Sequence, residues 1–236
     1  MIDFHSHVLP GIDDGSKSVG MSLRMLEESF RLGIDHMVAT PHFDANETSP
    51  SVFLAERQRA AEQLLQAIDS YPQVEFPQLT LGAEVLYFPG ISVAEEITQL
   101  RMGSSPCILI EPPMKPWTRQ ILDEIEQMGR NFQLVPVIAH VDRYMRLLKD
   151  ETLLERVLER RMLVQVNASY FLYRESRARA IRDLQNGKLH FLGSDCHNMD
   201  RRRQNLHLTR ETIQNAGAEA ILNALDTKGR NILGIE

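Results

Sequence analysis

Histidines and carboxylates occur in this sequence at spacings that suit metal binding and phosphate chemistry. The run His5–His7 places two imidazoles one residue apart, so at a strand end both can lean to the same side and chelate one cation. The run Asp195–His197 repeats this spacing with one anionic ligand. A carboxylate such as Glu84 can bridge two metal ions about 3.5–4 Å apart, an arrangement that clamps phosphoryl oxygens and generates hydroxide. These residues predict a metal-dependent phosphoesterase.

Nine candidate metal ligands fall at the C-terminal end of a predicted strand or in the loop that follows it. They are His5, His7, Asp14, His42, Glu84, Glu111, His140, Asp195 and His197. In a barrel of parallel strands these ends meet at one face, so we expect the nine side chains to converge. Nine ligands exceed what one ion needs, because a transition-metal ion takes about four to six, some of them shared. The sequence therefore predicts two to three divalent ions.

Each of these residues taken alone is better explained as an ordinary hydrogen-bonded side chain. Their joint placement at strand ends is what favours a metal site. Asp13 is an additional acid, for which capping the loop is a sufficient role. His36 and His190 lie at strand starts and His207 lies in a helical stretch, so we assign these three no catalytic role.

Short apolar runs alternate with segments of helical period along the whole chain, a pattern typical of repeated βα units. The predicted strands are Met1–His5, Ile34–Thr40, Leu79–Leu86, Cys107–Glu111, Leu134–Ala139, Leu163–Asn167 and Leu189–Gly193. The predicted helices are Val19–Leu32, Ser51–Ser70, Val93–Arg101, Thr118–Arg130, Glu151–Arg160 and Ser176–Gln185, with further helix near the C-terminus. Gly33, Gly129 and Gly187 are expected to end helices. The stiff segment Pro112–Trp117 follows a strand and is expected to form the rim of the site. About seven parallel strands predict a TIM-like α/β barrel.

The composition limits the possible classes of function. The chain has 236 residues, 43% hydrophobic and 25% charged, which predicts one soluble globular domain over residues 1–236. A net charge of −6 disfavours general binding to nucleic acid. The N-terminus lacks the pattern of a signal peptide and no apolar stretch reaches the length of a membrane span, so we expect a cytoplasmic protein with no membrane insertion. Cys107 and Cys196 are both expected to be free thiols.

Five motifs spread over the chain resemble a known family. They are Asp3–Gly15, Ala39–Phe43, Gly82–Val85, His140–Arg143 and Gly193–Asn198. The motifs and their order are similar to those of the polymerase and histidinol phosphatase (PHP) superfamily, and in particular of its capsule-type (CpsB/CapC-like) bacterial protein-tyrosine phosphatases. The resemblance implies a distorted (β/α)7 barrel with a trinuclear centre, commonly of manganese, with iron or zinc as alternatives. It also implies a phosphotyrosine protein as substrate, the cognate tyrosine kinase of capsular or exopolysaccharide synthesis.

The resemblance assigns roles to residues of this chain. It makes the nine strand-end residues the metal ligands, and Arg143 a catalytic arginine. Arg202 matches a second arginine of the family, although Arg201 and Arg203 flank it. Where the family commonly has His-Pro-Glu-Arg this chain has His-Val-Asp-Arg, which puts only the local turn geometry in question. The expected reaction is attack of a metal-activated hydroxide on phosphorus, with the arginines neutralising charge on the phosphoryl oxygens.

Other functions remain open from the sequence alone. Cys196 and Arg202 have the spacing of cysteine-dependent tyrosine phosphatases, but the five residues between them include no glycine and contain a candidate ligand. A small-molecule phosphatase, acting for example on histidinol phosphate, would use the same metal chemistry. A catalytically silent metal-binding regulator of the kinase and a nuclease are further alternatives, disfavoured respectively by the complete ligand set and by the acidic charge.

Overall fold

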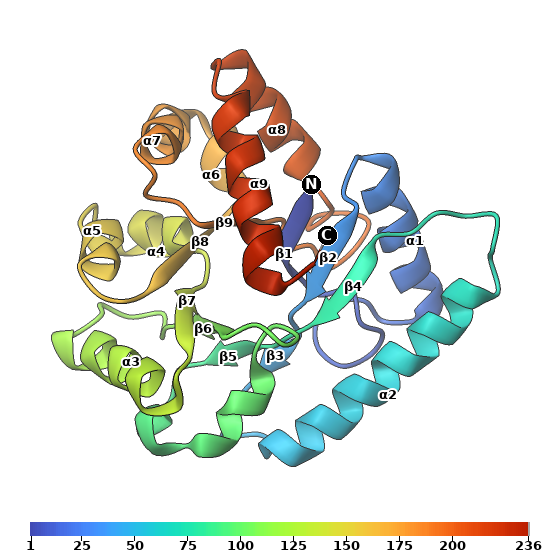
Figure 1. Ribbon diagram of the computed structural model, residues 1–236, viewed down its shortest axis with the longest axis horizontal. Helices are drawn as coiled ribbons and strands as arrows, with labels where there is room; N and C mark the ends of the chain where they lie inside the picture. Colours follow the sequence, from blue (N-terminus) through green and yellow to red (C-terminus); the bar gives the residue numbers. More distant parts are fainter. Residues whose placement is uncertain (236) are drawn as a thin grey trace.

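Parallel strands curl around the centre of the molecule, and helices pack outside them (Figure 1). The computed structural model describes residues 1–235. The strands there are β1 Ile2–Ser6, β2 His36–Ala39, β3 His42–Phe43, β4 Gln78–Leu81, β5 Glu84–Leu86, β6 Cys107–Glu111, β7 Val135–Ile138, β8 Leu163–Asn167 and β9 Phe191–Gly193. Every pairing between these strands is parallel.

The strands form two sheets that continue into each other. Their orders are β1-β2-β4 and β3-β5-β6-β7-β8-β9. The last strand returns to the first, because the Asp195 N–H donates to the His5 carbonyl over 2.8 Å and the His7 N–H donates to the Cys196 carbonyl over 2.9 Å. The result is a curled parallel sheet that is consistent with a distorted TIM-like barrel.

Two predicted strands differ from the structure. The segment Leu79–Leu86 is divided into β4 and β5, and the short strand β3 follows β2 after an interruption. Pro41 lies at that interruption and has no N–H for the ladder, while its carbonyl accepts the Glu84 N–H over 3.0 Å. The break therefore starts new strands at His42 and Glu84, two of the candidate ligands.

The helices mostly follow the predicted segments. They are α1 Val19–Arg31, α2 Pro50–Asp69, α3 Arg119–Phe132, α4 Val141–Leu148, α5 Leu153–Leu158, α6 Ser169–Leu172, α7 Arg174–Gln185, α8 Leu206–Asn215 and α9 Glu219–Leu233, with 3-10 turns η1 Ile91–Val93 and η2 Glu95–Leu100. The side chains of Ser18, Ser49 and Thr118 cap α1, α2 and α3 by accepting backbone N–H groups. None of these helices is long and apolar enough to cross a membrane.

Two expectations about helices were wrong, and two short helices were not predicted. Gly129 does not end a helix but lies inside α3, where an added Cβ would come within 2.9 Å of the Pro136 ring. Gln133, at φ 56°, ends that helix instead. The segment predicted as helix Val93–Arg101 is a 3-10 turn, and the short helices α4 and α6 were not predicted. Gly33 and Gly187 do adopt the left-handed conformation of a helix end.

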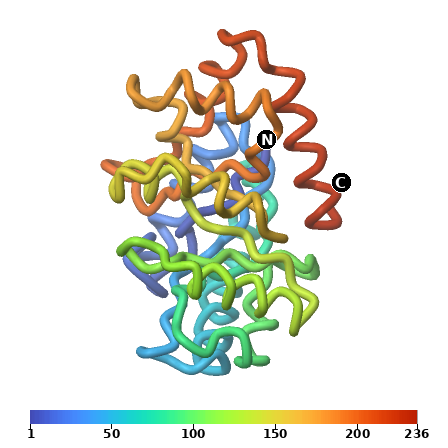
Figure 2. The backbone as a smooth tube through the Cα atoms, turned by 90° about the vertical axis from the view of Figure 1, so that its left-hand side faces the viewer, coloured from blue at the N-terminus to red at the C-terminus, as the bar shows by residue number. Residues whose placement is uncertain are grey.

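Alternation along the strands separates two apolar layers. In β6, Ile108 and Ile110 pack in the large layer toward the helices, whereas Cys107 and Leu109 belong to a second cluster with Phe4 of β1. Helix α9 closes this second cluster and runs beside both chain ends (Figure 2). Its Asp226 carboxylate accepts the Ile2 N–H over 2.7 Å. This second cluster therefore fills the end of the barrel that lies away from the candidate ligands.

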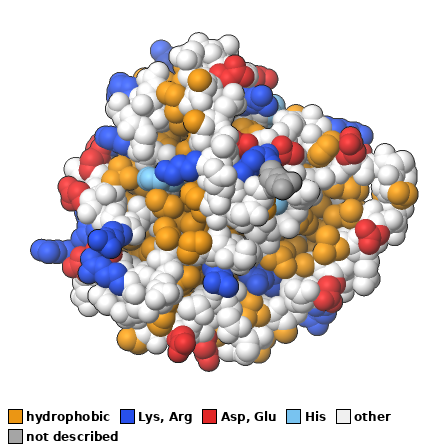
Figure 3. All heavy atoms as spheres, in the orientation of Figure 1, with side chains coloured by type: hydrophobic (Ala, Val, Ile, Leu, Met, Phe, Trp, Pro, Cys, Tyr) orange, Lys and Arg blue, Asp and Glu red, His pale blue; other side chains and the backbone are white. Residues whose placement is uncertain are grey.

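A groove of about 560 Å³ lies between α2 and β4. Hydrophobic side chains gather over this region in Figure 3, and the lining includes Leu65, Phe76 and Leu79. His36, which begins β2, also lines the groove, so it opens near the N-terminal ends of the strands. The groove is thus separate from the face on which the candidate ligands lie.

The contact between α9 and β1 gives a stability test. An added Cβ at Gly229 would lie 2.2 Å from Phe4 Cζ, inside the buried cluster. We expect Gly229→Ala to lower the free energy of unfolding by about 1–3 kcal/mol, because overpacking displaces the ring or the helix. The control Gly20→Ala in α1, where the nearest atom is 3.8 Å away, should be neutral or raise it by up to about 1 kcal/mol. Urea unfolding of both variants decides, and equal effects would contradict this packing.

Candidate metal centre

The Glu84 carboxylate is the centre of the cluster of candidate ligands. Its side chain is 1% exposed, and its Oε2 atom lies 3.0 Å from His5 Nε2, 3.2 Å from His7 Nε2 and 3.1 Å from His42 Nδ1. The Oε1 atom lies 2.8 Å from His140 Nε2. Both oxygens therefore face ring nitrogens, which is the arrangement a bridging carboxylate needs.

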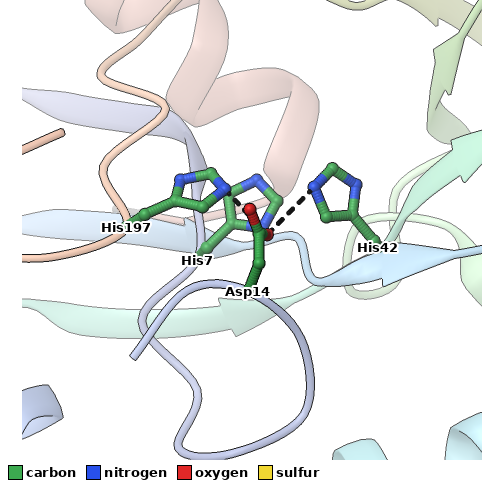
Figure 4. Close-up of side chains that lie close together, drawn as sticks. All are labelled: His7, Asp14, His42 and His197. Carbon is green, nitrogen blue, oxygen red and sulfur yellow. Dashed lines mark ion pairs between the residues drawn. The ribbon is translucent and has the colours of Figure 1, made fainter. Parts of the chain in front are cut away.

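A second group lies at the more open side of the cluster. Asp14, on the loop after β1, lies between two rings, with its Oδ1 atom 3.4 Å from His42 Nε2 and 3.2 Å from His197 Nε2 (Figure 4). The His7 ring lies beside the His197 ring at a centroid distance of 3.8 Å, tilted by 32°. Potential ligand atoms of these four residues lie within 4.8 Å of one another. They can hold a cation together.

The remaining candidate ligands adjoin these groups. Glu111 ends β6, and its Oε1 atom lies 3.4 Å from His140 Nε2. Asp195 follows β9, and its Oδ1 atom lies 3.5 Å from His7 Nε2 and 3.7 Å from His5 Nε2. All nine side chains predicted from strand ends are thus brought into one cluster, although their role as ligands stays a prediction.

Two candidate ligands have strained backbones. His140 has φ 32° and Asp195 has φ 56°, in the left-handed region that costs a residue with a side chain about 1–3 kcal/mol. Hydrogen bonds hold both, since the His140 N–H donates to Gln165 Oε1 over 2.6 Å and the Asp195 N–H to the His5 carbonyl. The register of β1 also shifts between Asp3 and Ser6, as at a bulge that re-aims side chains. The local backbone is adapted to the cluster at three separate strands.

Residues behind the cluster orient the histidines. Asp13 accepts from His7 Nδ1 over 2.7 Å, and from the backbone N–H groups of Gly15 and His42. Gln165 Oε1 lies 3.2 Å from His5 Nδ1. Such partners fix which ring nitrogen is free to bind a metal. From the sequence alone, only the role of a loop cap is expected for Asp13.

Strand β8 carries a signal that the sequence analysis did not use. Gln165 and Asn167 are polar residues at alternate positions, next to buried Val164 and Val166. A buried polar residue needs a partner, so this alternation points to a polar network on one side of the strand. In the structure Asn167 Nδ2 donates to Asp195 Oδ2 over 3.0 Å.

The cluster keeps the Glu84 carboxylate ionised. Burial alone would raise the pKa of Glu84, but charge on His5 and hydrogen bonds from the histidines hold that pKa well below its ordinary value. Burial would lower the pKa of His7, but Asp13 and Glu84 outweigh it and raise that pKa to about 10. Burial and the charge of His7 lower the pKa of His197 to about 4. Cation binding at this cluster would therefore release protons.

The donor atoms fit divalent transition metals. Imidazole nitrogens and carboxylate oxygens together suit manganese, iron or zinc. The buried Nε2 atom of His197 makes no hydrogen bond with any described residue, although it lies beside Asp14 and His7. A buried nitrogen without a hydrogen-bond partner is costly, and a bound cation would satisfy it.

Two arginines lie against Asp195. Arg143, in the first turn of α4, donates from Nη2 to Asp195 Oδ2, and Arg202 donates from Nη2 to Asp195 Oδ1 over 2.8 Å. Their side chains are 25% and 39% exposed. The neighbouring Arg201 and Arg203 are exposed, and no contact of theirs with the cluster is seen in the described residues. Of the three consecutive arginines, Arg202 is therefore the one that faces the site.

The surroundings of Cys196 oppose its use as a nucleophile. Burial raises the pKa of its thiol, and the carboxylates of Asp3 and Asp195 raise it further. The backbone N–H groups of His197 and Asn198 both donate to the Arg202 carbonyl, over 2.7 and 3.2 Å. The loop therefore presents neither a ready thiolate nor these two N–H groups to a phosphate, both of which a cysteine-dependent phosphatase requires.

The segment Pro112–Trp117 follows β6 as expected, and its role as the rim of the site stays a prediction. Trp117 is 4% exposed and packs edge-on against Tyr144 at a centroid distance of 4.7 Å, so its ring supports the segment Pro112–Trp117 from below. Met114 in the same segment is 53% exposed.

The contact between Asp13 and His7 predicts a loss of metal affinity. We expect Asp13→Ala to weaken manganese binding about 10–100-fold, because the His7 ring loses the acceptor that orients it. Asp13→Asn keeps an acceptor oxygen and should lose less. Competition with a chelator and elemental analysis measure the effect. The control Asp44→Ala removes an acid whose carboxylate accepts from Asn46, and should bind metal normally. Unchanged affinity in Asp13→Ala would refute the role given to Asp13.

Comparisons with known proteins agree with the fold and with the motifs. The family model described as "Capsular polysaccharide synthesis, CpsB/CapC" matches residues 1–232. Tyrosine-protein phosphatase CpsB of Streptococcus pneumoniae is 30% identical over 215 residues, which cover 86% of this chain and 85% of that protein. Tyrosine-protein phosphatase YwqE of Bacillus subtilis (strain 168) is 29% identical over 222 residues, covering 90% and 82% of the two chains.

A solved structure shares the fold. It comes from the crystal structures of YwqE from Bacillus subtilis and CpsB from Streptococcus pneumoniae, described as metal-dependent tyrosine phosphatases. The superposition has a TM-score of 0.86 at 23% identity and covers 99% of this chain and 94% of the other. With the family model matched over nearly the whole sequence, this chain belongs to the CpsB/CapC family of capsular polysaccharide synthesis proteins.

Proposed function

We propose that this chain is a metal-dependent phosphatase that removes phosphate from tyrosine in proteins. The observation that carries the proposal is the Glu84 carboxylate, whose two oxygens face four imidazoles beside two partly exposed arginines. Two relatives that match this chain over most of their length are named tyrosine-protein phosphatases, which supports the same reaction.

We also propose that the cluster holds two to three divalent ions, with manganese as the first choice. Three overlapping groups would hold them: His5, His7 and Glu84; His42, Glu84 and Glu111; and His7, Asp14, His42 and His197. His140 and Asp195 lie against these groups and complete the donor set. Bound ions of this kind supply a Lewis acid and lower the pKa of bound water to near neutrality.

Arg143 and Arg202 are proposed to bind the phosphoryl group. Their guanidinium groups contact Asp195 from two sides and remain partly exposed. A guanidinium has five N–H donors, so each arginine can keep its bond to Asp195 and turn further donors to phosphate oxygens. This arrangement meets negative charge that grows on these oxygens in the transition state.

The proposed substrate is a phosphotyrosine protein, specifically the tyrosine kinase of capsular or exopolysaccharide synthesis. The capsular polysaccharide description of the family supports that pathway. His5, His7 and Glu84 are fully buried while Asp14 and His42 are partly exposed, so a substrate must reach inward past the rim. An aromatic ring holds its phosphate farther from the backbone than a serine side chain does, which favours phosphotyrosine. Histidinol phosphate or another small phosphate ester is the second candidate, since it needs the same cluster.

We further propose that residues 1–236 form one phosphatase domain with a distorted (β/α)7 barrel, acting in the cytoplasm. The two interruptions that produce β3 and β5 lie within single passes of the chain, which supports counting seven strands.

A substrate panel tests the proposed activity. With manganese, phosphotyrosine peptides should be hydrolysed at least about tenfold faster in kcat/KM than phosphoserine peptides, a difference of about 1.4 kcal/mol. Chelation should abolish hydrolysis, and added manganese should restore it better than magnesium. Arg143→Ala should lower kcat about 100-fold at unchanged metal content. Histidinol phosphate is the control substrate. If it is hydrolysed far better than the peptides, the tyrosine assignment fails, and full activity without metal would refute the centre itself.

Replacement of Cys196 separates metal-dependent hydrolysis from thiol catalysis. We expect Cys196→Ala to keep most of its kcat on an aryl phosphate, whereas removal of a nucleophile would remove nearly all of it. Mass spectrometry of the wild-type protein during turnover should detect no phosphocysteine. A trapped phosphocysteine would establish the alternative mechanism.

A further inference from the structure

A cavity of about 650 Å³ lies between α4, α6 and α7, which are neighbours on one side of the molecule (Figure 1). Its lining includes Arg146 and Lys149 from α4 and its end, and Tyr170 and Tyr173 from α6 and its end. None of the nine candidate ligands lines it. The cavity is therefore a separate space from the metal centre.

The cavity adjoins the metal centre through α4 and β8. Asp142 lines the cavity and directly precedes Arg143. The Asp142 Oδ1 atom accepts the Asn167 N–H over 2.8 Å, and the Asn167 side chain donates to Asp195. Arg146 follows Arg143 by three residues, so both side chains lie on one face of α4, with Cβ atoms about 5–6 Å apart. A ligand can thus contact the phosphate-binding face and the cavity at once.

Two of the three cations that line the cavity are unpaired among the described residues. Its third cation, Arg179, pairs with Glu151 and lies 3.4 Å from Asp183. Arg146 and Lys149 form no ion pair within the described part of the chain, and the Arg146 guanidinium lies 5.4 Å from the centre of the Tyr173 ring. Two of the three lining acids, Asp142 and Glu175, also lack an ion pair with a described residue. Asp142 is 8% exposed and its carboxylate accepts the Asn167 N–H, whereas Glu175 lies in the first turn of α7, where the helix dipole favours its charge.

We propose that this cavity binds residues next to the phosphotyrosine of the protein substrate and selects an acidic side chain there. The proposal rests on the function proposed above. An extended peptide advances about 3.3 Å per residue, so with the phosphate at Arg143 an acid one to three positions away reaches Arg146 and Lys149. The Tyr173 side chain is 47% exposed and offers a ring face to the intervening peptide.

Peptide kinetics test the proposal. The substrates are three phosphotyrosine peptides that differ only in carrying Glu, Ala or Lys at the flanking positions, together with an aryl phosphate that has no flanks. The wild-type enzyme should prefer the Glu peptide over the Ala peptide by about 5–10-fold in kcat/KM, through KM, at low salt. The double variant Arg146→Ala/Lys149→Ala should lose this preference and keep its kcat on the aryl phosphate. The charge reversal Arg146→Glu/Lys149→Glu should favour the Lys peptide.

A matched control removes equal charge elsewhere. Arg101 and Arg161 are exposed and precede β6 and β8, so they lie at the opposite ends of the strands from the metal centre. Arg101→Ala/Arg161→Ala should keep the full preference for the Glu peptide. Absence of that preference in the wild type, its survival in Arg146→Ala/Lys149→Ala, or an equal loss in the control overturns the cavity assignment. If the aryl phosphate is hydrolysed but none of the peptides is, the proposed function itself fails, and the cavity assignment fails with it.

Discussion

The structure of the site depends on one buried charge, the Glu84 carboxylate. An ionised carboxylate removed from water costs several kcal/mol unless partners replace its hydration. Four imidazoles from three segments of the chain provide these partners, at 2.8 to 3.2 Å. Each imidazole reaches Glu84 only if its strand begins or ends at the right height. The position of one acid therefore constrains where β1 and β7 end and where β3 begins.

This constraint explains why irregular backbone gathers around the cluster. The interruption at Pro41 sets the start of β3, the shift in β1 lies beside His5, and His140 and Asp195 adopt positive φ. A regular ladder would send alternate side chains to opposite faces, so several ligands from neighbouring strands could not all face one point. The network of Gln165, Asn167 and Asp13 holds these departures in place. Strain at the ligands is thus balanced by hydrogen bonds one layer further out.

Much of this arrangement could be predicted from the sequence. The strand ends could be located because apolar runs are followed by His, Asp or Glu. All nine of these candidate ligands do converge. The residues that orient the ligands were harder to predict. Asp13 adjoins Asp14 in the sequence, and its hydrogen bond to His7 depends on how the loop folds back. Gly129 resembled a helix end, yet its role is to let Pro136 approach, a tertiary contact that local pattern does not encode. Helices α4 and α6 are too short for a period to show.

The placement of the arginines bears on how a phosphate can enter without disrupting the cluster. Asp195 is anionic and nearly buried, so removing both guanidinium groups from it would leave an uncompensated charge. Because Arg143 and Arg202 approach its two oxygens from separate segments, each can direct its remaining donors outward while the other bond persists. The candidate ligands His5, His7 and Glu84 thus lie deep, whereas the two guanidinium groups are partly exposed, as are the candidate ligands Asp14 and His42. In the proposed function, a phosphate held by the outward donors of Arg143 and Arg202 would therefore lie beside the candidate ligands while Asp195 keeps its hydrogen bonds.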